Sequence, residues 1–108
     1  MKDGIYKISF DTNVNRNGQL DGIVTVKDGH INGGDYVCYY QGVLSGEKVT
    51  VKSVPHNKND TTAFNNHDAV ELELTLKEVG SSYHFQGAVK GNPSQTINGK
   101  LQFLNDLI

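Results

Sequence analysis

The sequence predicts an all-β protein: a small up-and-down antiparallel β-barrel of about eight strands. Residues 1–108 are expected to form a single domain, since the chain has the length of one ordinary domain. Apolar side chains recur at every second position in successive segments, which is the period of a strand with one buried face. Glycine occurs 12 times and proline only twice, a balance typical of strands joined by tight turns. No segment carries a helical apolar period.

The first two strands are expected over residues 4–10 and 20–27, where apolar and polar residues alternate. A polar stretch between them ends at Asn17-Gly18, and Asp28-Gly29 follows the second strand. Both dipeptides are typical of β-hairpin turns, because they accept the positive φ that such turns require. The N-terminal quarter of the chain therefore predicts two antiparallel neighbours.

A short third strand is expected over residues 30–32 and a fourth over 36–43, where aromatic residues are frequent. Gly33, Gly34 and Asp35 lie between them. The two glycines allow positive φ or a close approach of backbones, and the aspartate accepts hydrogen bonds from nearby amides. These three residues are predicted to form a structural turn motif.

A fifth strand is expected over residues 48–54, and Pro55 is expected to end it because proline cannot donate to a ladder. Residues 56–68 then form the one long irregular connection, which is rich in Asn, Asp, Lys and Thr. Phe64 is its only large apolar residue. We expect Phe64 to anchor this loop to the core.

The last three strands are expected over residues 70–77, 83–89 and 97–103. The first of them alternates leucines with charged residues and is the clearest amphipathic strand in the chain. Turns are predicted at 80–82 and 91–94, where glycine, serine, asparagine and proline gather.

Consecutive strands with short turns predict a meander, and closure into a barrel would remove its exposed edges. Glycines lie inside several expected strands, at Gly22, Gly42, Gly87 and Gly99. Such glycines are typical of sharply bent strands and favour the barrel. A sandwich of two sheets is the alternative.

Charge and cysteine content exclude several classes of function. The formal net charge is −2, which argues against direct nucleic-acid binding and against a basic membrane anchor. Apolar runs are short and the first residues lack the apolar segment of a secretory signal, so no membrane association is expected. The single cysteine, Cys38, excludes a disulfide framework and indicates a reducing, cytoplasmic compartment. Without a histidine at a characteristic spacing, Cys38 is expected to be a buried, unreactive side chain.

No catalytic, metal or cofactor site is predicted. The segment that starts at Asp11 begins like a calcium loop, but Arg16 and Gly22 stand where glycine and glutamate are needed. His56 and His67 flank the long loop without a characteristic spacing, and a zinc site there would need a third ligand such as Asp60 or Asp68.

Six segments together resemble the GrlR-type family of negative regulators of bacterial type III secretion. They are Met1–Tyr6, Phe10, Gly22–Val24, Lys27–Gly29, Gly33–Asp35 and Tyr40–Ser45. The resemblance covers residues 1–45 and continues collinearly to the C-terminus. It implies a lipocalin-like β-barrel that forms a homodimer, binds a transcriptional activator protein and silences it.

In the characterised branch of that family, four acidic residues follow the stretch that matches Tyr40–Ser45 and take part in partner recognition. The corresponding residues here are Gly46, Glu47 and Lys48, of which only Glu47 is acidic. They are the candidate partner-binding loop.

Three functions follow as hypotheses. The first is a non-enzymatic regulatory protein that binds a transcriptional regulator. The second is a carrier of a small apolar ligand inside the barrel. Its candidate ligand-lining residues are Phe10, Leu72, Leu74, Phe85 and Phe103. The third is an enzyme that uses the 56–68 loop with His56 and His67.

Overall fold

The computed structural model describes residues 1–15 and 19–108, and within them it forms strands and no helix. The strands are β1 (Gly4–Thr12), β2 (Leu20–Lys27), β3 (His30–Gly34), β4 (Cys38–Ser45), β5 (Lys48–Pro55), β6 (Val70–Val79), β7 (Ser82–Val89) and β8 (Asn92–Asn105). The described residues therefore contain no helix long or apolar enough to cross a bilayer. The predicted Asn17-Gly18 turn, and Arg16 of the rejected calcium loop, lie outside the described residues.

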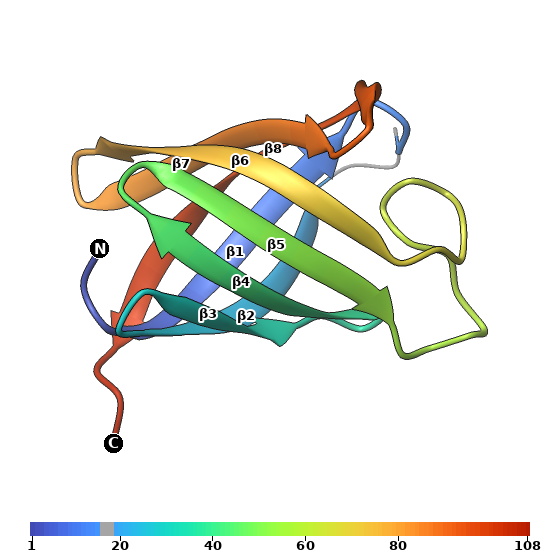
Figure 1. Cartoon of the computed structure of the whole chain (residues 1–108). Helices are drawn as coiled ribbons and strands as arrows, with labels where there is room; N and C mark the ends of the chain where they lie inside the picture. Colours follow the sequence, from blue (N-terminus) through green and yellow to red (C-terminus); the bar gives the residue numbers. More distant parts are fainter. Residues whose placement is uncertain (16–18) are drawn as a thin grey trace.

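The strands close into an antiparallel barrel in chain order, which confirms the predicted fold class over the sandwich (Figure 1). Each strand pairs with the next, and β8 returns to pair with β1. In that closing seam, Ile8 lies opposite Leu101 and Thr12 lies opposite Ile97. Closure leaves no long strand edge unpaired, so the backbone hydrogen bonds of the wall are made within the barrel.

The two ends of the barrel are built differently, and this difference positions the site. At one end, which we call the turn end, the tight turns Asp28–Gly29, Gly46–Glu47 and Gly80–Ser81 join neighbouring strands. Both chain termini lie at this end as well (Figure 1). The opposite end, the loop end, carries residues 35–37 and 56–69.

An aromatic cluster of Tyr6, Tyr83 and Phe103 fills the interior at the turn end. The Tyr6 ring lies edge-on to Phe103 and Tyr83, with ring centroids 5.4 and 6.5 Å apart. The Tyr6 hydroxyl donates a 2.6 Å hydrogen bond to the Lys2 carbonyl, so the polar tip of this buried ring is satisfied. Val26, which is fully buried, belongs to the same half of the barrel. The aromatic cluster therefore occupies the interior at the turn end.

The predicted turn at residues 33–35 is wrong. Gly33 and Gly34 belong to β3, and the chain turns at residues 35–37 instead. Gly33 lies between Val24 on β2 and Tyr40 on β4. Neither glycine has a positive φ. Glycine is needed at both positions because neighbouring backbones approach too closely for a side chain. Because the turn comes later, β4 begins at Cys38.

Both prolines lie in strands. Pro55 was predicted to end the fifth strand, and Pro93 was predicted to lie in a turn. Pro55 is the last residue of β5 and lies opposite Cys38. Pro93 belongs to β8, and the predicted turn at 91–94 forms earlier, at Lys90–Gly91. The register between β7 and β8 shifts at this point, so no ladder bond needs the missing N–H of Pro93.

Candidate functional site

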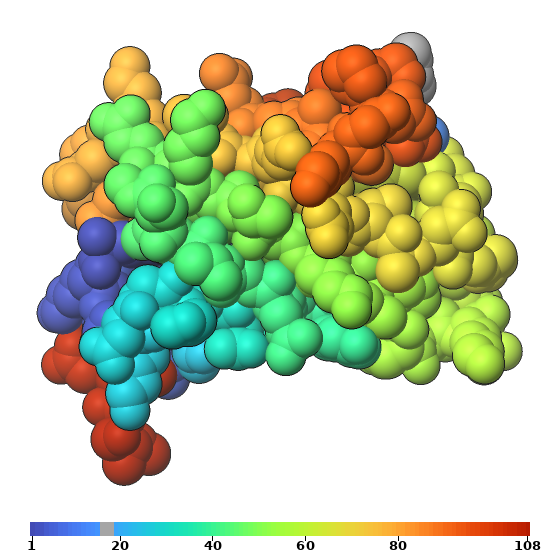
Figure 2. Space-filling view, viewed as in Figure 1, coloured from blue at the N-terminus to red at the C-terminus, as the bar shows by residue number. Residues whose placement is uncertain are grey.

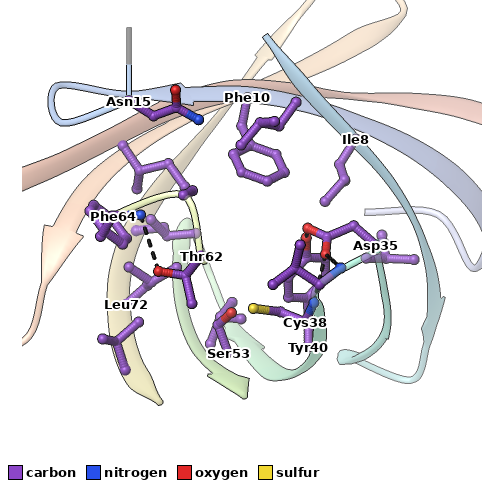
Figure 3. Close-up of a pocket in the computed structure, with 18 of the residues that line it drawn as sticks. Ile8, Phe10, Asn15, Asp35, Cys38, Tyr40, Ser53, Thr62, Phe64 and Leu72 are labelled. Carbon is purple, nitrogen blue, oxygen red and sulfur yellow. Dashed lines mark hydrogen bonds between the residues drawn. The ribbon is translucent and has the colours of Figure 1, made fainter. Parts of the chain in front are cut away.

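The barrel holds a partly open cavity of about 430 Å³, whose lining runs from the lid to Val49 on β5 and Leu76 on β6. All eight strands contribute to its wall, mainly through inward apolar side chains (Figure 3). Its apolar wall residues are Ile8, Phe10, Leu20, Val24, Ile31, Val37, Cys38, Val49, Val51, Ala63, Phe64, Val70, Leu72, Leu74, Leu76, Phe85, Ile97 and Leu101. These residues alternate with outward polar ones along the strands, as the period of two predicts.

Four of the five predicted ligand-lining residues belong to this wall: Phe10, Leu72, Leu74 and Phe85. Phe103 does not, and its prediction is wrong. The Phe103 ring lies in the aromatic cluster at the turn end, with the Lys2 ammonium 4.4 Å from its centroid. Alternation gave the correct face of its strand, but Phe103 lies too far along the barrel to reach the cavity.

The strand-internal glycine Gly99 lets the Phe85 ring and the Cβ of Phe10 approach the wall closely. A Cβ atom at Gly99 would lie 2.7 Å from the Phe85 ring and 2.3 Å from the Ser9 carbonyl oxygen. Any side chain there would displace the ring or the neighbouring strand. The interior volume therefore depends on the absence of a side chain at Gly99 as well as on the side chains that line the wall.

Residues 56–69, which we call the lid, lie over the loop end of the barrel (Figures 1 and 2). Phe64 is only 6% exposed and packs against the core, which confirms its predicted role as an anchor. A compact turn presents it: the Thr62 hydroxyl bonds to the Asn66 side chain at 2.8 Å and accepts the Phe64 amide at 3.2 Å. Asn65 completes the turn with a left-handed φ of 59°.

Polar contacts hold the lid on two sides of the barrel mouth. On one side, the Thr12 hydroxyl donates a 2.7 Å hydrogen bond to the Ala63 carbonyl. On the other side, the His56 amide donates to the Val37 carbonyl at 2.8 Å, and the His56 ring bonds to the Asp35 carbonyl at 2.9 Å. The lid residues 58–61 between these attachments are largely exposed.

Asp35 organises the other rim segment, residues 35–37. One carboxylate oxygen accepts the amides of Val37 and Cys38 at 2.8 and 2.7 Å, which confirms the predicted amide acceptor. The other oxygen accepts the hydroxyl of Tyr40, whose ring belongs to the cavity wall. The sequence does not predict this pairing, because no local pattern indicates that Asp35 and Tyr40 meet across a turn.

The Cys38 thiol faces the cavity beside Ser53 (Figure 3). Cys38 is 4% exposed. Burial raises the pKa of the thiol, while a hydrogen bond with Ser53 lowers it and the nearby Asp35 carboxylate raises it further. The net direction is upward, so the thiol is protonated at neutral pH and is a poor nucleophile. This agrees with the expectation of a buried, unreactive side chain.

The other candidate residues do not converge on a chemical site. His56 and His67 are both exposed. Within residues 1–15 and 19–108, no group of three or more His, Cys, Asp or Glu side chains is placed to hold a metal ion. Gly46 and Glu47 form a tight turn and Lys48 begins β5, so the candidate partner-binding loop lies at the turn end, away from the cavity mouth.

Tyr36 was expected to begin the fourth strand, and this expectation is wrong, since β4 begins at Cys38. The Tyr36 side chain is 76% exposed, because it precedes β4 and lies in the rim segment. Tyr36 nevertheless contributes to the cavity wall at the mouth.

No protein-family model matches this sequence, and no curated protein matches it. The resemblance to the GrlR-type family, with the regulatory role and the homodimer that it implies, stays a prediction.

Proposed function

We propose that the protein binds a small apolar ligand inside its barrel. The observation that carries this proposal is the apolar cavity of about 430 Å³ that all eight strands line. Its volume falls within the range of small-molecule sites, roughly 300–1,000 Å³. Barrels of this strand number are either filled by their own side chains or hold one small ligand. An unfilled apolar space forfeits dispersion contacts that a ligand would restore.

The two ends of the barrel indicate the route of entry. The aromatic cluster of Tyr6, Tyr83 and Phe103 fills the turn end. At the loop end, one aromatic anchor and a few hydrogen bonds hold the lid. Moving the lid breaks none of the strand pairing that closes the barrel. The ligand therefore enters beneath the lid.

Cys38 provides a built-in reporter for this proposal, because it is the only cysteine and faces the cavity. We expect decanol, a neutral apolar probe, to slow alkylation of Cys38 by N-ethylmaleimide by at least about fivefold at saturation, in proportion to occupancy. Mass spectrometry measures the rate. The thiolate is the reacting form. Because burial raises the thiol pKa, the rate without decanol should keep rising above the pH range in which an exposed cysteine levels off.

A matched control separates protection from a direct effect of decanol on the reagent. The double variant Cys38→Ser with Ser81→Cys moves the thiol to an exposed turn at the turn end. The alkylation rate of this double variant should not change when decanol is added. Equal alkylation rates of Cys38 with and without decanol, together with no binding heat in calorimetry, would contradict the proposed function.

A further inference from the structure

We propose that the preferred ligand is an amphiphile with an apolar chain and a positively charged head, such as a primary alkylamine. The chain would occupy the cavity and the head would lie at the loop end. This inference rests on the proposed function and adds to it the chemical class of the ligand.

The charged residues of the cavity wall are all of one sign. Those that the structure describes are Asp21, Asp35, Asp60 and Asp68, with no lysine, arginine or histidine beside them. All four lie at the loop end: at the start of β2, in the rim segment and in the lid. The apolar depth of the cavity and the acidic character of its mouth match the two parts of a cationic amphiphile.

The hydrogen bonds that Asp35 and Asp21 accept come from neutral groups. Asp35 accepts two backbone amides and the Tyr40 hydroxyl, and Asp21 accepts the Ser9 hydroxyl at 3.1 Å. The ion pairs within the described chain, Lys2 with Asp106 and Lys90 with Glu71, use other carboxylates. Neutral donors orient a carboxylate without cancelling its charge, so the mouth keeps a negative potential.

The lid carries positive or titratable groups too, but these do not belong to the wall. Lys58, His56 and His67 are exposed, and the His56 ring is engaged with the Asp35 carbonyl. Asp60 and Asp68 are exposed as well, but unlike these three residues they line the cavity, so acids border a ligand head at the mouth.

Aromatic rings supply a second preference for a cation. Tyr36 lines the mouth although 76% of its surface is exposed, and Phe64 and Tyr40 contribute rings just inside. Aromatic faces attract ammonium groups through their quadrupole. An anionic head would meet these carboxylates, and no base among the described wall residues would pair with it, so it would be disfavoured there.

Isothermal titration calorimetry at pH 7 with three probes of equal chain length tests this inference: decylammonium and decanoate below their micelle concentrations, and decanol below its solubility limit. We expect decylammonium to bind about tenfold more tightly than decanoate, with decanol between them, as one favourable charge contact implies. Added salt should lower the ratio of the decylammonium affinity to the decanoate affinity, because the mouth is open to solvent. The alkylation rate of Cys38 is measured with each probe, and a slower rate indicates that the probe lies inside the barrel.

Matched double variants assign the effect to the mouth. Asp60→Asn with Asp68→Asn removes two exposed carboxylates from the lid, and Glu47→Gln with Glu78→Gln removes two exposed ones at the turn end. The first pair should reduce the ratio to about threefold or less, and the second should leave it unchanged. Urea unfolding verifies that both pairs fold.

The outcomes are distinct for the two proposals. Decanoate binding as tightly as decylammonium, or a ratio that salt does not alter, overturns this inference and leaves the proposed function intact. An unchanged ratio in the lid variant overturns it too. If no decyl compound binds or protects Cys38, the proposed function itself fails.

Discussion

Gly33 lies where two neighbouring strands approach too closely for any side chain. A Cβ atom there would lie 2.1 Å from the Ile23 carbonyl oxygen and 2.6 Å from the Val24 Cα. Since these are backbone atoms, no rotamer change relieves the clash. We expect Gly33→Ala to lower the free energy of unfolding by about 2–3 kcal/mol, the upper range for overpacking. Equilibrium urea unfolding measures the loss.

Gly46→Ala is the matched control for that substitution. Gly46 has a φ of 62° and no atom within 4 Å of an added Cβ, so alanine there meets backbone strain and no clash. The expected loss is about 1 kcal/mol. Equal losses in the two variants would show that β2 and β3 separate easily, contrary to the close pairing of Val24 with Gly33.

Individual residues also show why the sequence analysis misassigned some positions. Glycine is compatible with a turn, a bulge and a close backbone approach, so Gly33 and Gly34 were placed in a turn although they lie in β3. For Phe103, alternation gave the face of the strand but not the depth along the barrel axis. Both errors concern contacts between strands, which a local pattern does not contain.

At the scale of elements, the lid is a separate unit attached to a barrel whose strand pairing is complete without it. Phe64 anchors it, and its remaining ties are side-chain and backbone hydrogen bonds at the mouth. We expect Phe64→Ala to speed alkylation of Cys38 by about tenfold, because the lid then opens without global unfolding. The loss in unfolding free energy should fall below the ~3–5 kcal/mol typical of a core phenylalanine.

Asn59→Ala serves as the control within the same loop, because Asn59 is exposed. It should alter neither the alkylation rate nor the stability. The contrary result is a Phe64→Ala variant that loses the ~3–5 kcal/mol of unfolding free energy typical of a core phenylalanine while Cys38 stays shielded in the folded state. It would show that the lid is a fixed part of the core.

The sequence predicted the anchor of the lid but not its attachments. Phe64 was identified because it is the one large apolar side chain in a polar segment. The bond from Thr12 to Ala63 joins residues 51 positions apart, and nothing in either local sequence indicates the other. Long-range polar contacts of this kind become visible only when the barrel places its loops side by side.

At the scale of the whole molecule, closure was predictable and the cavity was not. Most strands show the period of two, and the short turns that join many of them lead to a meander that closes on itself. Whether the interior is filled depends on the summed volume of side chains from eight strands and on glycines such as Gly99. The same alternation is consistent with a packed core and with a ligand cavity, so both alternatives remained open.

The closed wall and the separate lid lead to a final prediction about chain connectivity. The termini lie at the turn end, where Ile5 pairs with Asn105 and Lys2 bonds to Asp106 at 3.2 Å. A short glycine-serine linker from Ile108 to Met1 would join them without crossing the cavity mouth. Two circular permutants then place the new ends either in the Gly46–Glu47 turn or in the lid.

Both permutants should give the same β-rich circular dichroism spectrum, because each cut falls in an exposed connection and leaves the barrel pairing intact. They should differ in access to the interior. The cut at Gly46–Glu47 leaves Cys38 shielded, whereas a cut between Asn59 and Asp60 frees the two halves of the lid and speeds alkylation of Cys38. If the second permutant fails to fold, the strands do not form a self-sufficient wall, and the lid must be counted among the elements that close the barrel.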